Sequence, residues 1–209
     1  TTPEIVSLSK QLLEHGDSAS AFVSLSAPQT GAADEGATKI YVLDQDRPKT
    51  FASMVVTLSQ LELTVVDAYI SKASGDRYFD MFTVLDEDGT EVSDPALRQG
   101  IVDQVKATLA NPEPSTNGAT QRVSRQLKEL KMPASVSLTA QEDGLTAVLN
   151  VTASDRPGLL ANIALVLVEL GLEVTSARIT TLGERVEDVF LVTRVDGASI
   201  NDAQQCYDI

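Results

Sequence analysis

The sequence predicts an α+β fold built from two copies of one βαββαβ unit, packed side by side and preceded by a short N-terminal helix and strand. The first observation is an internal repeat, in which Asp46–Ile70 aligns with Asp155–Ile179 at a constant offset of 109. After one residue of slippage the match continues at an offset of 108, for example from Asp80 onto Asp188. The second observation is that both copies show the same order of strand and helix patterns. A repeat of this length indicates duplicated structural units.

The N-terminal part and the first unit can be divided by their patterns. Residues 1–37 are expected to hold the N-terminal helix and a lead-in strand, and residues 38–140 the first unit. Alternating apolar residues predict strands, and an apolar stripe at helical spacing predicts a helix. The expected elements are a strand at Thr38–Leu43, a helix at Pro48–Leu61, strands at Leu63–Ala73 and Arg77–Leu85, and a helix capped by Ser93 or Asp94 with Pro95 at its start.

The second unit, residues 141–209, repeats this order. Apolar and polar residues alternate in a strand at Leu145–Ala153, and a helix with one apolar stripe follows at about Pro157–Leu170. Two strands, 172–181 and 185–195, are then joined by a short glycine-containing hairpin, and Asn201 could cap a second helix. The order is β-α-β-β-α, which a closing strand would complete as a ferredoxin-like sandwich of helices on an antiparallel sheet.

We expect the two units to differ in whether a last strand closes their sheet. For the first unit we expect Pro133–Ala140, which follows a linker rich in Pro, Gly, Ser and Thr, to close the sheet. A turn at 141–144 then leads into the second unit, so the two units should meet through a hairpin and share sheet edges. For the second unit no closing strand is expected, because Ile209 corresponds to Ile101 within the first unit's second helix. The second unit is therefore expected to be truncated in its last helix.

Composition excludes several classes of partner and site. The 16 Lys and Arg residues against 30 Asp and Glu residues give a net charge of −14, which argues against a nucleic-acid or membrane partner. A single cysteine, Cys206, allows no internal disulfide, and the N-terminus lacks a signal peptide, so a cytoplasmic location is expected. One histidine, His15, cannot build a metal cluster, and the acidic turns at 86–89 and 142–144 lack the ligand spacing of a calcium loop. We expect no catalytic residues, no metal site and no cofactor.

The most informative stretch is the loop Asp155–Leu160, which separates a strand from an apolar helix. Pro157 and Gly158 could serve only to turn the chain into the helix. Alternatively the loop binds a ligand, because backbone N–H groups at a helix start can bind a carboxylate and Asp155 can pair with an ammonium group. The candidate ligand-binding residues are Asp155, Arg156, Pro157, Gly158, Leu159 and Leu160.

The tandem units, the loop "SDRPGLL" and the hairpin "ITTLGERVEDVF" together resemble the ACT-domain family of amino-acid sensors. They are similar in particular to the ACT pair of the bifunctional enzymes that attach and remove uridylyl groups on the signalling protein PII. The resemblance implies a regulatory module that senses glutamine or another small amino acid. Its further partners would be catalytic domains of a longer enzyme, which use Mg²⁺, and through them PII. It also implies a ligand held between this loop and the neighbouring unit.

The corresponding loop of the first unit departs from this pattern. Asp46, Arg47 and Pro48 are present, but Lys49 stands where the second unit has Gly158. Because a side chain there would crowd a ligand that approaches the backbone, these four residues are weaker candidates for a second site.

Three functions remain open from the sequence. The chain could be the glutamine-sensing module of the PII-modifying enzyme, a free-standing double-ACT sensor or regulator for another amino acid, or an interaction module without a ligand. The sequence leaves the ligand, the number of sites and the oligomeric state undecided.

Overall fold

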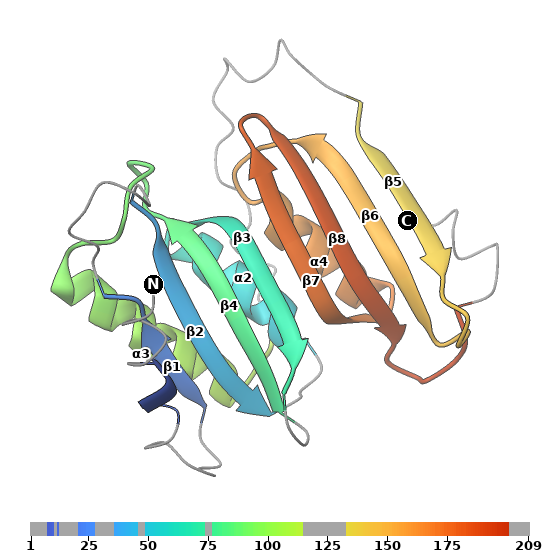
Figure 1. The fold of residues 1–209 in the computed structure, drawn as a ribbon, viewed down its shortest axis with the longest axis horizontal. Coiled ribbons are helices and arrows are strands. Elements are labelled where there is room, and N and C mark those ends of the chain that lie inside the picture. The colour runs from blue at the N-terminus through green and yellow to red at the C-terminus, as the bar shows by residue number, and fades with distance from the viewer. Residues whose placement is uncertain are drawn as a thin grey trace.

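The described residues form one eight-stranded antiparallel sheet with helices on one face (Figure 1). The computed structural model describes residues 8–10, 12, 21–27, 36–45, 49–73, 77–114 and 133–200. Along the sheet the strands follow the order β1-β2-β4-β3-β7-β8-β6-β5. The strands are β1 (Phe22–Leu25), β2 (Thr38–Gln45), β3 (Thr64–Lys72), β4 (Arg77–Leu85), β5 (Ser135–Ala140), β6 (Thr146–Ser154), β7 (Leu172–Leu182) and β8 (Arg185–Arg194), and the helices are α2 (Thr50–Gln60), α3 (Pro95–Ala110) and α4 (Leu159–Glu169).

The structure confirms the two ferredoxin-like units. Helices α2 and α4 begin and end at positions 109 apart, as the repeat predicts. In both units the helix leads to a β-hairpin, and the second strand of that hairpin lies between the first two strands of the unit.

The two units are joined by the antiparallel pairing of β3 with β7, which merges their sheets. Asp67 lies opposite Thr180, and Ile70 lies opposite Ala177. At the centre of this register Tyr69 lies opposite Arg178, which is its own counterpart 109 positions later. The register therefore places a pseudo-twofold axis between these two residues, and each unit presents the same edge to the other.

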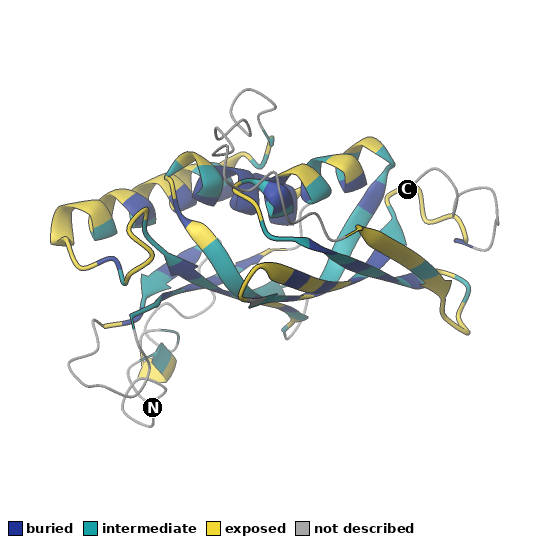
Figure 2. Ribbon diagram, turned by 90° about the horizontal axis from the view of Figure 1, so that it is seen from above, coloured by how far each residue is buried: buried dark blue, intermediate teal, exposed yellow. Residues whose placement is uncertain are grey.

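One large apolar core spans both units. Helices α2, α3 and α4 cover the same face of the sheet (Figure 2), and most of the buried apolar residues of the two units form one continuous cluster. Phe51 at the start of α2 makes an edge-to-face contact with Phe190 of β8, with ring centroids 6.0 Å apart. Because this contact joins the first unit to the second, the junction is part of the core as well as of the sheet.

The closing strand differs from our expectation. Strand β5 does not close the first unit but pairs with β6 at the outer edge of the second, with Val136 opposite Val151. The position beside β2 is already filled by β1, so the first unit offers no free edge there. A tight turn favours the local pairing, because the Asp143 carboxylate accepts hydrogen bonds of 2.9 Å from the N–H groups of Leu145 and Thr146.

The N-terminal end of α3 agrees with the predicted cap. Asp94 accepts a 2.9 Å hydrogen bond from the N–H of Ala96, and Pro95 occupies the first turn. Arg98 on the same helix donates to the carbonyls of Val92 and Ser26, and so ties α3 to the end of β1. The predicted N-terminal helix lies outside the described residues except for 8–10 and 12, which are helical, and Asn201 also lies outside them.

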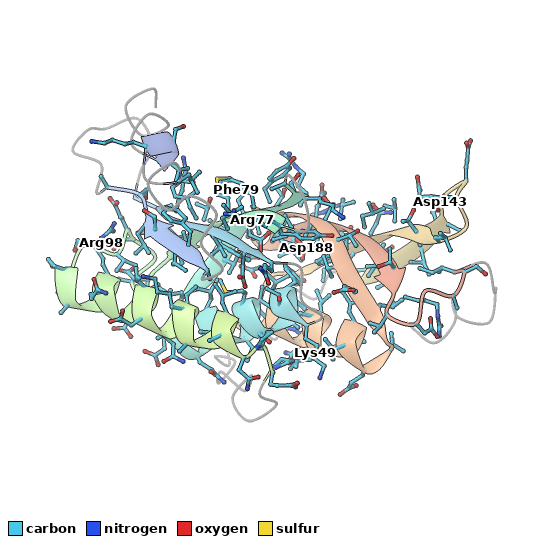
Figure 3. The ribbon with its side chains drawn as sticks, turned by 90° about the horizontal axis from the view of Figure 1, so that it is seen from below. Lys49, Arg77, Phe79, Arg98, Asp143 and Asp188 are labelled. Atoms are coloured by element: carbon cyan, nitrogen blue, oxygen red, sulfur yellow. The ribbon has the colours of Figure 1, made fainter. Side chains whose placement is uncertain are left out.

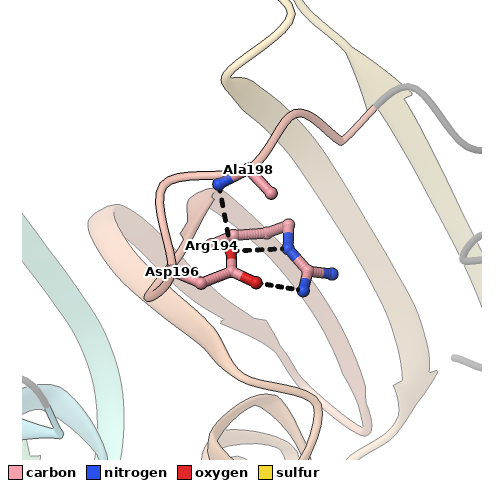
Figure 4. Close-up of polar contacts among 3 residues, drawn as sticks. All are labelled: Arg194, Asp196 and Ala198. Atoms are coloured by element: carbon pink, nitrogen blue, oxygen red, sulfur yellow. Dashed lines mark hydrogen bonds and ion pairs between the residues drawn. The ribbon is translucent and has the colours of Figure 1, made fainter.

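Strand β8 ends in a turn that Asp196 organises (Figure 4). The carboxylate of Asp196 accepts from Arg194 Nε at 2.8 Å and Nη2 at 2.6 Å, and from the N–H of Ala198 at 3.0 Å. These hydrogen bonds, of which that from Arg194 is the strongest influence, lower the pKa of Asp196 below its usual range. After this turn the N–H of Ile200 donates to the carbonyl of Gly144, which joins the end of β8 to the β5–β6 hairpin.

The shared core predicts cooperative unfolding. Phe51→Ala should lower the free energy of unfolding by about 3–5 kcal/mol, because it removes a buried ring and leaves a cavity at the junction. Phe79→Ala, which truncates a half-buried ring within the first unit, is the control and should cost less. Urea titrations followed by circular dichroism and amide exchange should show one transition for both units; two separate transitions would contradict a shared core.

Candidate functional site

The loop that precedes α4 has a fixed backbone geometry. The N–H of Asp155 donates to the carbonyl of Glu184 at 2.8 Å, and the N–H of Leu159 donates to the carbonyl of Arg156 at 3.1 Å. Gly158 is the N-cap residue, with φ of 74°, and no side chain caps the helix. A left-handed backbone favours glycine for conformational reasons alone, so Gly158 is explained by the turn whether or not a ligand binds.

The start of α4 leaves backbone donors available. None of the hydrogen bonds among the described residues uses the N–H of Leu160 or Ala161. The N–H of Leu159 is used inside the loop, where it donates to the carbonyl of Arg156. The donors at the start of α4 that can bind an anion are therefore the N–H groups of Leu160 and Ala161.

A cavity of about 110 Å³ lies between this loop and the first unit. All six predicted residues, Asp155–Leu160, line it. The first unit supplies its opposite wall from α2 and the start of β3, namely Val55, Ser59, Leu63, Thr64 and Val65. The loop and the neighbouring unit thus meet at one cavity, and this cavity exists only because β3 and β7 pair.

The floor of this cavity carries a buried carboxyl group that sequence reasoning missed. Asp188 on β8 is 2% exposed and lines the cavity with Asp155, near the centre of the molecule (Figure 3). Burial raises the pKa of Asp188 to about 6, and the nearby charge of Asp155 adds to the rise. Burial also raises the pKa of Asp155, against a lowering hydrogen bond from the backbone of Arg156. Two carboxyl groups in one enclosed space favour a cationic occupant.

The first unit forms a matching but smaller cavity of about 40 Å³ against the second unit. Its wall from the second unit consists of Ala164, Leu167, Val168, Leu172, Glu173 and Val174. All of these except Leu167 are the counterparts, at an offset of 109, of the first-unit residues that line the larger cavity. The two cavities are therefore related by the same pseudo-twofold axis as the strands.

Lys49 distinguishes the smaller cavity. It is the N-cap of α2 with φ of 69°, so it adopts the left-handed conformation of Gly158 in spite of its side chain. Its Nζ lies 3.0 Å from Glu113 Oε2 in an exposed ion pair, and the residue lines the cavity. The backbone φ at this position is thus nearly the same in both units, and the difference there is an added cation. Asp46, Arg47 and Pro48 lie outside the described residues.

Asp80 on β4 is the counterpart of Asp188. It is 4% exposed, lines the smaller cavity, and its Oδ1 has no hydrogen-bond partner among the described residues. Burial raises its pKa to about 7, with a further contribution from Asp44. The sequence did hold a signal for both acids, because each interrupts the buried face of an apolar strand at corresponding positions of the repeat.

Other site types find no support within the described ranges. The described residues contain no group of three or more His, Cys, Asp or Glu side chains that could hold a metal ion. His15 and Cys206 lie outside the described residues. Within the same part of the chain, no helix combines the length and the apolar character needed to cross a membrane.

Comparison with known proteins identifies relatives over most of the chain. A protein from Pseudomonas putida (strain W619) is 39% identical over 173 residues, which are 82% of this chain and 19% of the relative. A protein from Acinetobacter baumannii (strain AYE) is 34% identical over 201 residues, which are 96% of this chain and 22% of the relative. Both are named bifunctional uridylyltransferase/uridylyl-removing enzyme. The chain therefore spans about a fifth of the length of these relatives.

Two further matches concern the units themselves. Residues 136–205 match a family model described as the ACT-like domain of plant bHLH transcription factors. A crystal structure of aspartate kinase from Synechocystis aligns with 82% of this chain and 25% of its own, at 18% identity and a TM-score of 0.42. The chain is a tandem pair of ACT-type units that, over most of its length, is homologous to one segment of the bifunctional uridylyltransferase/uridylyl-removing enzymes.

Proposed function

We propose that this chain is an amino-acid-sensing regulatory module that binds glutamine in the larger cavity between its two units. In the longer enzyme that we propose contains it, the module controls the balance between uridylylation and deuridylylation of PII. The observation that carries this proposal is the cavity itself, which brings the loop Asp155–Leu160 against α2 and β3 of the other unit. The names of the relatives supply the proposed reaction.

The groups around the cavity complement a zwitterionic amino acid. The free N–H groups of Leu160 and Ala161 at the start of α4 can donate to a carboxylate, which the helix dipole also favours. Asp155 can accept from an α-ammonium group. The apolar wall from Val55 and Leu63 can then contact the side chain of the ligand.

Regulation follows from the position of the cavity. A ligand that contacts both units stabilises some relative positions of the two units more than others. It acts on attached catalytic domains only through a difference in affinity between two such arrangements. High glutamine signals ample nitrogen, so we propose that its binding favours uridylyl removal over transfer.

The first prediction from this proposal concerns Asp155. Asp155→Asn should weaken glutamine binding by about 10- to 100-fold, because it removes a charge-assisted hydrogen bond worth about 1.5–3 kcal/mol. The measurement is isothermal titration calorimetry of residues 1–209 with glutamine, glycine and serine. Asp103→Asn, on the exposed side of α3, is the matched control and should bind as the unchanged protein does.

The outcomes separate the three candidate functions. Binding of glycine or serine in place of glutamine would favour a sensor for another amino acid, and no binding at all would favour an interaction module. In the longer enzyme, Asp155→Asn should retain uridylyl transfer but lose its response across a glutamine titration. A normal glutamine response in that variant would place the sensor elsewhere.

A second prediction exchanges the residues that distinguish the two loops. Gly158→Lys should fold, because Lys49 already adopts the same conformation in the first unit, but at a cost of about 1 kcal/mol for the left-handed backbone. It should also weaken glutamine binding by adding a side chain at the cavity. The control is Lys49→Gly, which should leave binding unchanged and stabilise the fold slightly. Thermal unfolding and calorimetry measure both effects, and unaltered binding by Gly158→Lys would exclude close approach of the ligand to this backbone.

A further inference from the structure

The least explained group in the larger cavity is the carboxyl group of Asp188. It comes from β8, opposite Val151 of β6, and it lines the cavity although only 2% of the residue is exposed. A carboxylate removed from water in this way destabilises the protein unless a cation or several donors compensate it.

The described residues supply little compensation. The hydrogen bond that Asp188 accepts among the described residues is a long one, 3.4 Å from the N–H of Thr180 to Oδ1. Within the described ranges no Lys or Arg side chain forms an ion pair with it. Its charged neighbours at the cavity are Asp155, which repels it, and Arg156, which is exposed. The cavity therefore holds two carboxyl groups and lacks a buried cation among the described side chains.

The same arrangement occurs twice in the chain. Asp80 occupies the corresponding position on β4, lines the smaller cavity, and has an Oδ1 without a partner among the described residues. An acid at both of these positions is a feature of the repeated unit, and in both places it faces the junction of the two units.

We propose that Asp188 acts with Asp155 to bind the ammonium group of the ligand, so that the larger cavity selects ligands with a free primary ammonium. An ammonium group has three N–H donors and one positive charge, so it can pair with both carboxylates at once and relieve their repulsion. Arg156 at the exposed side of the cavity is then available to the ligand carboxylate. This inference rests on the proposed amino-acid binding, and it adds the residue that determines the charge of the ligand.

Isothermal titration calorimetry on residues 1–209 tests the role of Asp188 with two ligands and two variants. The ligands are glutamine and 4-carbamoylbutanoate, which keeps the carboxylate and the amide but lacks the amino group. The variants are Asp188→Asn and, in the smaller cavity, Asp80→Asn. We expect the unchanged protein to bind 4-carbamoylbutanoate at least tenfold more weakly than glutamine. Asp188→Asn should weaken glutamine binding at least tenfold, and Asp80→Asn by less than twofold.

Two further readouts separate binding from a structural role. Without ligand, Asp188→Asn should keep or raise the melting temperature at pH 7.5, because a neutral amide is less costly to bury than a carboxylate. Glutamine affinity of the unchanged protein should fall from pH 7.5 to 5.5, because the cation requires ionised carboxylates and the pKa of Asp188 is raised to about 6. The fall should be smaller in Asp188→Asn, where Asp155 is the remaining acid.

Each adverse result has a distinct meaning. If the unchanged protein binds no amino acid, the proposed function itself fails. If it binds glutamine but Asp188→Asn binds equally well, or if 4-carbamoylbutanoate binds as tightly as glutamine, the role of Asp188 is wrong and the proposed function stands. An equal loss in Asp188→Asn and Asp80→Asn would assign the effect to the fold and overturn the inference.

Discussion

The pairing of β3 with β7 is the contact on which the rest of the molecule depends. It joins two four-stranded sheets into one, with Tyr69 and its counterpart Arg178 at the centre of the register. Because the helices lie on a single face, this pairing also brings Phe51 of one unit onto Phe190 of the other. Both cavities lie where the loop of one unit meets the helix of the other, so neither would exist in a separated unit.

Pseudosymmetry makes the differences between the cavities informative. The backbone at Lys49 matches that at Gly158 within a few degrees of φ, so the fold does not distinguish these two positions. The side chains do, because Lys49 and Glu173 place charges on the smaller cavity where the larger one has Gly158 and Thr64. Duplication has thus kept the position of both cavities in the fold and altered the size and the chemistry of one.

Local patterns made much of this structure predictable. The repeat, the helices and the loop Asp155–Leu160 follow from spacing and from turn residues that act over a few positions. The strand that closes the first unit did not follow, because β1 rather than β5 lies beside β2, and this choice depends on tertiary contacts that no local pattern encodes. Asp188 was missed for a related reason: its role depends on the other unit, whose approach turns a position on a strand into the floor of a cavity.

The buried acids connect stability to binding. Asp80 and Asp188 both have pKa values raised by burial, so each destabilises the fold as pH rises from the pKa of the unfolded chain to the raised value in the folded one. Above that range both carboxylates are ionised and buried, and the free energy that this costs is offset by other contacts. A cationic ligand at Asp188 would remove part of that cost while contacting both units, so binding would strengthen the junction itself. Because the ligand contacts both units, binding in the larger cavity can alter the relative stability of two arrangements of the whole module.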